Sequence, residues 1–224
     1  MTCRRWNAQP FKLPAFPLLR KERIWAARAF QNVGLDYMGP ITECDLTDPC
    51  KRWIALFTCL ATIAIHLEAA KNLMAEQFLH VMRRFIARNG YPTSIVLDNA
   101  SYFPLVEQVM QNTLAAPITW RFITQFAPRQ GGVYERLVGL TKTALHKAVG
   151  RRLLDEEELK TLVVECEAIV NSRPLTYVGS AFERILRPVD FLRPQAIIGA
   201  QGPVPKMIKA CGTQQTDKAN CSDH

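Results

Sequence analysis

The chain has no apolar stretch long enough to cross a membrane. Its longest largely apolar run lies between Ile54 and Ile65, whereas a membrane-spanning helix needs about 20 apolar residues. The N-terminus also lacks the apolar core of a signal peptide, because the segment after Met1 is polar, basic and interrupted by prolines. The sequence therefore predicts no membrane partner.

Paired metal-binding cysteines and histidines are also missing. No two cysteines are spaced as CxxC and no two histidines as HxxxH, so no zinc is expected in this chain. The seven cysteines are odd in number and match no disulfide framework. Cys59 and Cys166 lie in apolar runs, and we expect both to be buried thiols in a reducing compartment.

Acidic residues are scarce relative to basic ones. The 224 residues include 28 lysines and arginines against 20 aspartates and glutamates, which gives a net charge of +8. Nucleic acid is a common partner of such a basic chain. Residues 1–30 hold seven of the basic residues and only one acidic residue. This segment is either a solvated basic tail or an arm that contacts phosphates.

The pattern of apolar residues predicts an α/β domain built around a mixed sheet. Residues 41–51 are polar and are expected to form a hairpin loop, and residues 127–132 a mobile loop, since prolines and glycines gather there. The predicted strands are residues 30–40, 53–60, 62–69, 94–97 and 118–122, and the predicted helices are residues 75–89, 104–115, 133–149 and 155–170.

The expected domain organisation follows from this pattern. Residues 1–29 form a basic, proline-containing linker, and residues 30–178 form the catalytic core. Residues 179–199 form a short ordered extension. Residues 200–224 are rich in glycine, proline, glutamine and lysine, which predicts a disordered tail.

Three acidic residues lie where elements are expected to begin or end. Asp36 is on the first strand, Asp98 follows the fourth, and Glu135 is expected in the first turn of the helix at 133–149. Acids at strand ends and a helix start can converge on one edge of an α/β sheet. Carboxylates gathered in this way can hold Mg²⁺ ions that clamp the attacking and leaving oxygens of a phosphodiester.

Each of these acids also has an ordinary structural explanation. Asp36 could be a turn residue before Gly39-Pro40, and Asp98 with Asn99 is a common turn pair at a strand end. Glu135 would be stabilised by the partial positive charge of a helix N-terminus. The functional interpretation therefore depends on all three acids together with their sequence contexts.

Those contexts resemble the three catalytic blocks of retroelement integrases, in particular those of LTR retrotransposons of the Pao/BEL type. The three blocks are Gly34–Pro40, Leu97–Phe103 and Gly131–Val138. Flanking segments with the same resemblance are Trp53–Cys59, Ile65–Glu68, Phe85–Gly90, Asn171–Thr176 and Pro188–Pro194. The similarity covers roughly residues 1–195.

The resemblance implies an RNase H-like fold, with a five-stranded mixed sheet flanked by helices, and polynucleotidyl transfer with two Mg²⁺ or Mn²⁺ ions. Asp36, Asp98 and Glu135 would be the catalytic metal ligands, with Asp36 bridging both ions. In such enzymes water first trims the 3′ end of the element DNA, and the exposed 3′-hydroxyl then attacks target DNA. The implied partners are DNA and at least a second copy of the chain, and the implied location is the nucleus.

The same resemblance suggests residues that bind nucleic acid. These are Asn99, Arg136, Lys142 and Lys147. Lys142 is expected to share a helix face with Glu135, although a solvated lysine is the alternative explanation. His66 and Glu68 lie in a predicted strand and are expected to be structural, with a place for His66 near the catalytic site as the alternative.

The sequence departs from the integrase pattern at several positions. Ala100 replaces a common glycine, and Arg129 and Tyr134 stand where tryptophan is usual. Cys3 resembles the last ligand of the family's N-terminal zinc-binding domain, and the C-terminal β-rich domain has no counterpart, so we expect a fragment. Two alternatives remain, a catalytically inactive integrase-derived DNA-binding module and an RNase H-like nuclease. The Asp-Asp-Glu pattern favours strand transfer over the nuclease.

Overall fold

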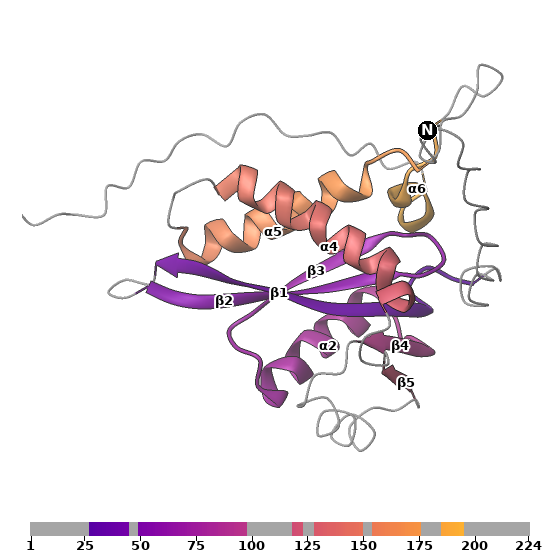
Figure 1. Cartoon of the computed structure of the whole chain (residues 1–224), viewed down its shortest axis with the longest axis horizontal. Coiled ribbons are helices and arrows are strands. Elements are labelled where there is room, and N and C mark those ends of the chain that lie inside the picture. The colour runs from indigo at the N-terminus through magenta and orange to yellow at the C-terminus, as the bar shows by residue number, and fades with distance from the viewer. Residues whose placement is uncertain are drawn as a thin grey trace, which may run out of the picture.

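The computed structural model describes residues 27–44, 49–97, 118–122, 128–149, 154–175 and 185–194. Most of the predicted linker, the helix predicted at 104–115 and the predicted tail lie outside these residues. Within them, a single five-stranded sheet is covered by helices on its two faces (Figure 1). No helix among them is long and apolar enough to span a bilayer.

The sheet has the strand order β3-β2-β1-β4-β5. β1 pairs antiparallel with β2, which pairs antiparallel with β3, whereas β4 is parallel to both β1 and β5. The sheet is therefore mixed, as predicted, with β1 in its centre and β3 at one edge. The strands are β1 (Asn32–Cys44), β2 (Pro49–Cys59), β3 (Ile65–Ala70), β4 (Ser94–Leu97) and β5 (Thr119–Phe122).

Helix α2 (Ala75–Asn89) covers one face of the sheet, and α4 (Pro128–Val149) and α5 (Glu156–Asn171) cover the other (Figure 1). A short helix, α6 (Pro188–Leu192), follows. The buried residues of α2 recur at helical spacing and pack in a cluster that includes Leu35 and Phe57. The cluster on the opposite face joins Leu56 and Leu67 of the sheet to α4 and α5.

The first strand is longer than predicted. It continues through Gly39-Pro40 to Cys44, so the prediction of a strand end there and of a loop at 41–51 is wrong. The pairing with β2 shifts register between Met38 and Ile41, which marks a bulge. A bulge accommodates a proline that cannot donate to the ladder. Gly39 has φ +138°, a conformation that side chains disfavour.

The helix that carries Glu135 also begins earlier than predicted. α4 starts at Pro128, so most of the loop predicted at 127–132 is helical and Glu135 lies about two turns inside the helix. The prediction placed too much weight on Gly131-Gly132, since each glycine costs a helix about 1 kcal/mol. Proline is favoured at the first helical position, because its missing N–H has no partner there anyway.

Other predicted bounds agree with the structure. The ranges of α2 and β4 are as predicted, and α5 begins one residue later because Asp155 is its N-cap. The Asp155 carboxylate accepts a hydrogen bond from the backbone N–H of Glu158 at 2.7 Å. Cys59 and Cys166 are buried free thiols, as expected, and burial raises the pKa of Cys166 to about 11.

Candidate active site

Asp36 lies in the centre of the sheet, between β2 and β4. It is paired with Leu56 of β2, and the preceding residue, Leu35, is paired with Leu97 at the end of β4. The side chain is half-buried, and its Oδ1 accepts a hydrogen bond from the backbone N–H of Tyr37 at 2.7 Å. Asp36 is therefore a carboxylate at the point where the parallel β1–β4 pairing ends.

The register determines which face of the sheet Asp36 occupies. Side chains alternate along a strand, and directly paired residues share a face. Leu35 packs in the α2 cluster, whereas Leu56, the partner of Asp36, packs in the cluster with α4 and α5. Asp36 is therefore on the face that α4 covers, the same face as the helix that carries Glu135.

Helix α4 presents a mixed acidic and basic surface to solvent. Glu135 is exposed and makes no hydrogen bond or ion pair within the described part of the chain. Lys142 follows seven residues later and so lies on the same side of the helix. Arg136 and Lys147 are exposed as well. Exposed cations of this kind are suited to phosphate contacts.

The other two predicted site residues, Asp98 and Asn99, lie outside the described residues. The residues that the structure does describe contain no cluster of three histidine, cysteine, aspartate or glutamate side chains able to hold a metal ion. The structure thus brings Asp36 and the Glu135 helix to one face of the sheet, and the complete set of three acids stays a prediction.

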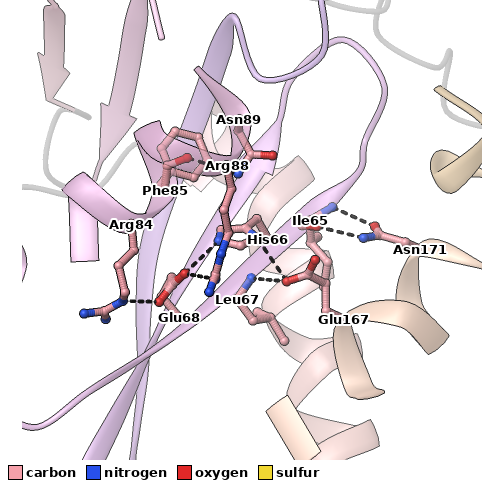
Figure 2. Close-up of polar contacts among 10 residues, drawn as sticks. All are labelled: Ile65, His66, Leu67, Glu68, Arg84, Phe85, Arg88, Asn89, Glu167 and Asn171. Carbon is pink, nitrogen blue, oxygen red and sulfur yellow. Dashed lines mark hydrogen bonds and ion pairs between the residues drawn. The ribbon is translucent and has the colours of Figure 1, made fainter. Parts of the chain in front are cut away.

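A second polar cluster lies at the opposite edge of the site's sheet, around His66 of β3 (Figure 2). The imidazole Nε2 is 3.1 Å from Glu68 Oε1, and Nδ1 is 3.1 Å from Glu167 Oε2 of α5. An imidazole can donate from both nitrogens only when it is protonated. Burial alone would lower the pKa of His66, but the hydrogen bonds and charges of Glu167 and Glu68 outweigh it and raise the pKa to about 8.

Glu68 connects this cluster to helix α2. Its carboxylate, only 5% exposed, accepts from Arg84 Nε at 2.6 Å and from an Arg88 guanidinium nitrogen. Burial would raise the pKa of Glu68, but the hydrogen bonds from His66 and Arg84 lower it below its usual value. The expectation that His66 and Glu68 are structural is confirmed by this burial and pairing. His66 is paired with Phe57 and so belongs to the α2 face, unlike Asp36.

Side chains of α5 occupy the backbone groups along the open edge of β3 (Figure 2). Asn171 accepts from the Ile65 N–H and donates to the Ile65 carbonyl, both at 2.8 Å. Glu167 accepts from the Leu67 N–H at 2.8 Å. An unprotected edge strand can pair with another chain, so these side chains close most of that edge.

Sequence reasoning missed the roles of Arg84, Arg88, Glu167 and Asn171. No linear pattern relates β3 to residues about a hundred positions later. The one available signal was the segment Asn171–Thr176, which has the family resemblance described above but gives no hint of what Asn171 contacts.

Comparisons with known proteins agree with this architecture. No protein-family model and no curated protein matches the chain. A chain of the simian T-cell lymphotropic virus intasome, solved with the PP2A regulatory subunit B56 gamma, matches 88% of this chain at 15% identity and a TM-score of 0.58. This chain covers 65% of that chain's length.

The magnesium-bound HTLV-2 integrase catalytic core domain, in its dimeric form, matches 68% of this chain and 92% of its own chain, at 14% identity and a TM-score of 0.48. The similarity to the intasome chain shows the fold. The five-stranded mixed sheet with flanking helices is the RNase H-like fold predicted from the sequence.

Proposed function

We propose that this chain is a retroelement integrase core of the Pao/BEL type, which performs metal-dependent 3′-end processing and strand transfer of element DNA into target DNA. The observation that supports this most is the placement of Asp36 on the sheet face covered by α4, the helix that carries Glu135. The RNase H-like fold, shared with an intasome chain, agrees with the proposal.

The strand register supports Asp98 as the third acid. Leu35 pairs with Leu97 across parallel strands, which lie about 4.8 Å apart in a sheet. A peptide bond holds the Cα atom of Asp98 about 3.8 Å from that of Leu97. Asp36 and Asp98 each follow a member of this pair, so a continued register would make them neighbours.

The chemistry of these side chains fits Mg²⁺ or Mn²⁺. Both ions prefer carboxylate oxygens, and Asp36 and Glu135 offer such oxygens on one face. We propose Asp36, Asp98 and Glu135 as the residues that hold two ions. Bound ions would stabilise charge on the attacking and leaving oxygens of the phosphodiester. Asp36, half-buried at a strand end, would give the site a fixed position.

The exposed cations of α4 would position the DNA. Arg136, Lys142 and Lys147 are suited to contacts with backbone phosphates, which fix the register of a duplex without reading its sequence. Asn99 is proposed as a further contact. Chromosomal DNA as the target implies action in the nucleus, and we propose at least a homodimer as the working assembly.

A disintegration assay tests the proposal. The full chain would be incubated with Mn²⁺ and a branched DNA that mimics the strand-transfer product, beside Asp36→Asn, Asp98→Asn and Glu135→Gln variants. We expect metal-dependent resolution of the branch by the wild type and loss of at least about 100-fold in each variant. Thermal unfolding of each variant would confirm that the fold is intact.

Each contrary result has a distinct meaning. Activity that persists in Asp36→Asn or Asp98→Asn would remove these residues as metal ligands. A folded wild-type chain that binds DNA but gives no product would support the alternative, an inactive integrase-derived DNA-binding module. Simple hydrolysis of the substrate without strand joining would instead support an RNase H-like nuclease.

A further inference from the structure

A cavity of about 380 Å³ opens beside edge strand β3, between helices α2 and α5. It lies at the opposite edge of the sheet from β5, and neither Asp36 nor α4 contributes to its walls. The apolar part of its lining includes Leu67, Leu159, Val163 and Val164. Val164 is 62% exposed although it is an aliphatic residue at a cavity rim.

The backbone of β3 is open at one step, and that step faces this cavity. Residues 65, 67 and 69 direct their backbone groups away from β2, as alternate residues of an edge strand do. Asn171 occupies both groups of Ile65, Glu167 occupies the Leu67 N–H, and Arg84 donates to the Ala69 carbonyl at 3.0 Å.

Two groups on this edge have no such partner. The Leu67 carbonyl and the Ala69 N–H form no hydrogen bond within the described part of the chain, and both residues line the cavity. An acceptor and a donor separated in this way are what one residue of an extended peptide needs. In a parallel ladder, its N–H would bond to the Leu67 carbonyl and its own carbonyl would accept from the Ala69 N–H.

The charged part of the lining has an excess of positive charge. Five basic side chains and two acidic ones line the cavity. Lys160 is already paired with Glu156 and Glu157 of its own helix. On the α2 side, Arg84 and Arg88 share the single carboxylate of Glu68, and their side chains are 40% and 59% exposed. Lys71 is exposed next to them.

We propose that this cavity binds a short acidic peptide in extended conformation, paired with β3 at Leu67 and Ala69. Side chains of an extended peptide alternate between two sides. One side would place aliphatic groups against Val163 and Val164 of α5, and the other would place carboxylates near Arg84, Arg88 and Lys71. This inference does not depend on the proposed catalytic function, since it involves neither DNA nor metal.

A peptide suits this cavity better than a nucleic acid does. The Leu67 carbonyl needs a hydrogen-bond donor, and a phosphodiester backbone has only acceptors. The aliphatic wall formed by Leu159, Val163 and Val164 likewise offers a phosphate nothing. A peptide backbone carries both a donor and an acceptor at every residue other than proline.

Fluorescence anisotropy with a labelled octapeptide of alternating glutamate and valine would test the proposal on the full chain, without DNA or divalent metal. We expect saturable binding. An octapeptide of alternating lysine and valine should bind at least about tenfold more weakly, because its charges are repelled by the basic side chains. Backbone N-methylation of the acidic peptide at alternating residues, in both registers, should abolish binding in the register that removes the donor to Leu67.

Three variants locate the site. Lys71→Glu should weaken binding of the acidic peptide about fivefold, the upper range for one exposed ion pair. Val164→Glu should weaken it about tenfold, because an apolar contact is lost and a like charge is added. Arg83→Glu is the matched control, since Arg83 is an exposed residue of α2 that does not line the cavity, and its affinity should equal that of the wild type. Unchanged thermal unfolding would show that each variant is folded.

Several results would overturn the proposal. Equal binding of the acidic and basic peptides, of the parent and both N-methylated peptides, or of the wild type and Lys71→Glu would each do so. Displacement of the peptide by short duplex DNA, with the same loss of DNA affinity in Lys71→Glu, would make this a polyanion site. Sedimentation velocity that shows self-association broken by Val164→Glu, with no peptide binding, would make it an interface between copies. None of these results bears on the disintegration assay.

Discussion

His66 of β3 and Glu167 of α5 form an ion pair at the sheet edge, with Nδ1 of the imidazole 3.1 Å from a carboxylate oxygen. The same carboxylate oxygen accepts the backbone N–H of Leu67. Glu167 therefore holds both the backbone and a side chain of the edge strand, and the charge state of one histidine affects how firmly α5 is attached to the sheet.

Stability should depend on pH through His66. Its folded-state pKa of about 8 exceeds the ordinary value of 6.5, so protonation stabilises the fold. This contribution is complete below pH 6.5 and is lost as the pH rises through 8. The difference corresponds to about 2 kcal/mol. Urea denaturation between pH 6 and pH 9 would measure it as a falling free energy of unfolding.

The acidic groups around His66 act at the other end of the pH scale. The pKa of Glu68 is lowered from 4.5, so its contribution to stability is present above that pH and is lost as the pH falls further. A His66→Gln variant should lose the alkaline slope and keep the acidic one. An unchanged alkaline slope in that variant would assign the effect to another group.

Removing the charge of Glu167 should lower the pKa of His66. In Glu167→Gln the side chain still offers an oxygen to the Leu67 N–H, but the attraction to the imidazolium is lost. We expect the imidazole pKa, followed by NMR, to fall toward 6.5 and the free energy of unfolding to fall by about 1–3 kcal/mol. Glu165→Gln on the same helix is the control, and an equal pKa change there would argue against a direct contact.

The Asn171 side chain should be the more critical of the two edge contacts. Asn171→Ala leaves the N–H and carbonyl of Ile65 without partners at a buried position. Each unsatisfied group costs about 1–3 kcal/mol, so we expect a loss of about 2–5 kcal/mol in chemical denaturation, with more aggregation through the opened edge. The neighbouring Ser172→Ala removes one hydrogen bond to Ala168 and should cost no more than about 1 kcal/mol.

Lys142 should contribute to DNA affinity through phosphate contact alone. Lys142→Ala should weaken binding about equally for unrelated duplex sequences, and the slope of log affinity against log salt should fall by about 1. Arg83→Ala removes the same charge from the opposite face of the sheet and should leave the slope nearly unchanged. A loss confined to one DNA sequence would indicate base contact instead.

Local sequence patterns were sufficient for most of the fold. The ranges of α2 and β4 followed from apolar periodicity and from flanking breakers such as Gly90, because these signals act within a few residues. The errors at Pro40 and at Gly131-Gly132 have a common cause. Each of these residues was taken to end an element, but pairing with β2 and packing of α4 on the sheet outweighed the local preference.

The site could be predicted only where the chain order itself carries information. The position of Asp36 on a strand followed from its context, and its face of the sheet follows from the register with Leu56. The contacts of Glu167 and Asn171 could not be predicted, since hydrogen bonds across about a hundred residues depend on how α5 packs beside β3. Burial, which sets the pKa of His66, depends on the same packing.

The bonds between Asn171 and Ile65 span 106 positions of the chain, and this separation has a consequence for biosynthesis. Ribosomes add about 5–20 residues per second, and domains tend to fold as their parts emerge. The N-terminal half of the sheet would therefore wait about 5–20 seconds, with the edge of β3 uncovered, before α5 is synthesised. During that interval the nascent chain has an open strand edge, which makes it a substrate for chaperones and, at high expression, a starting point for inclusion bodies.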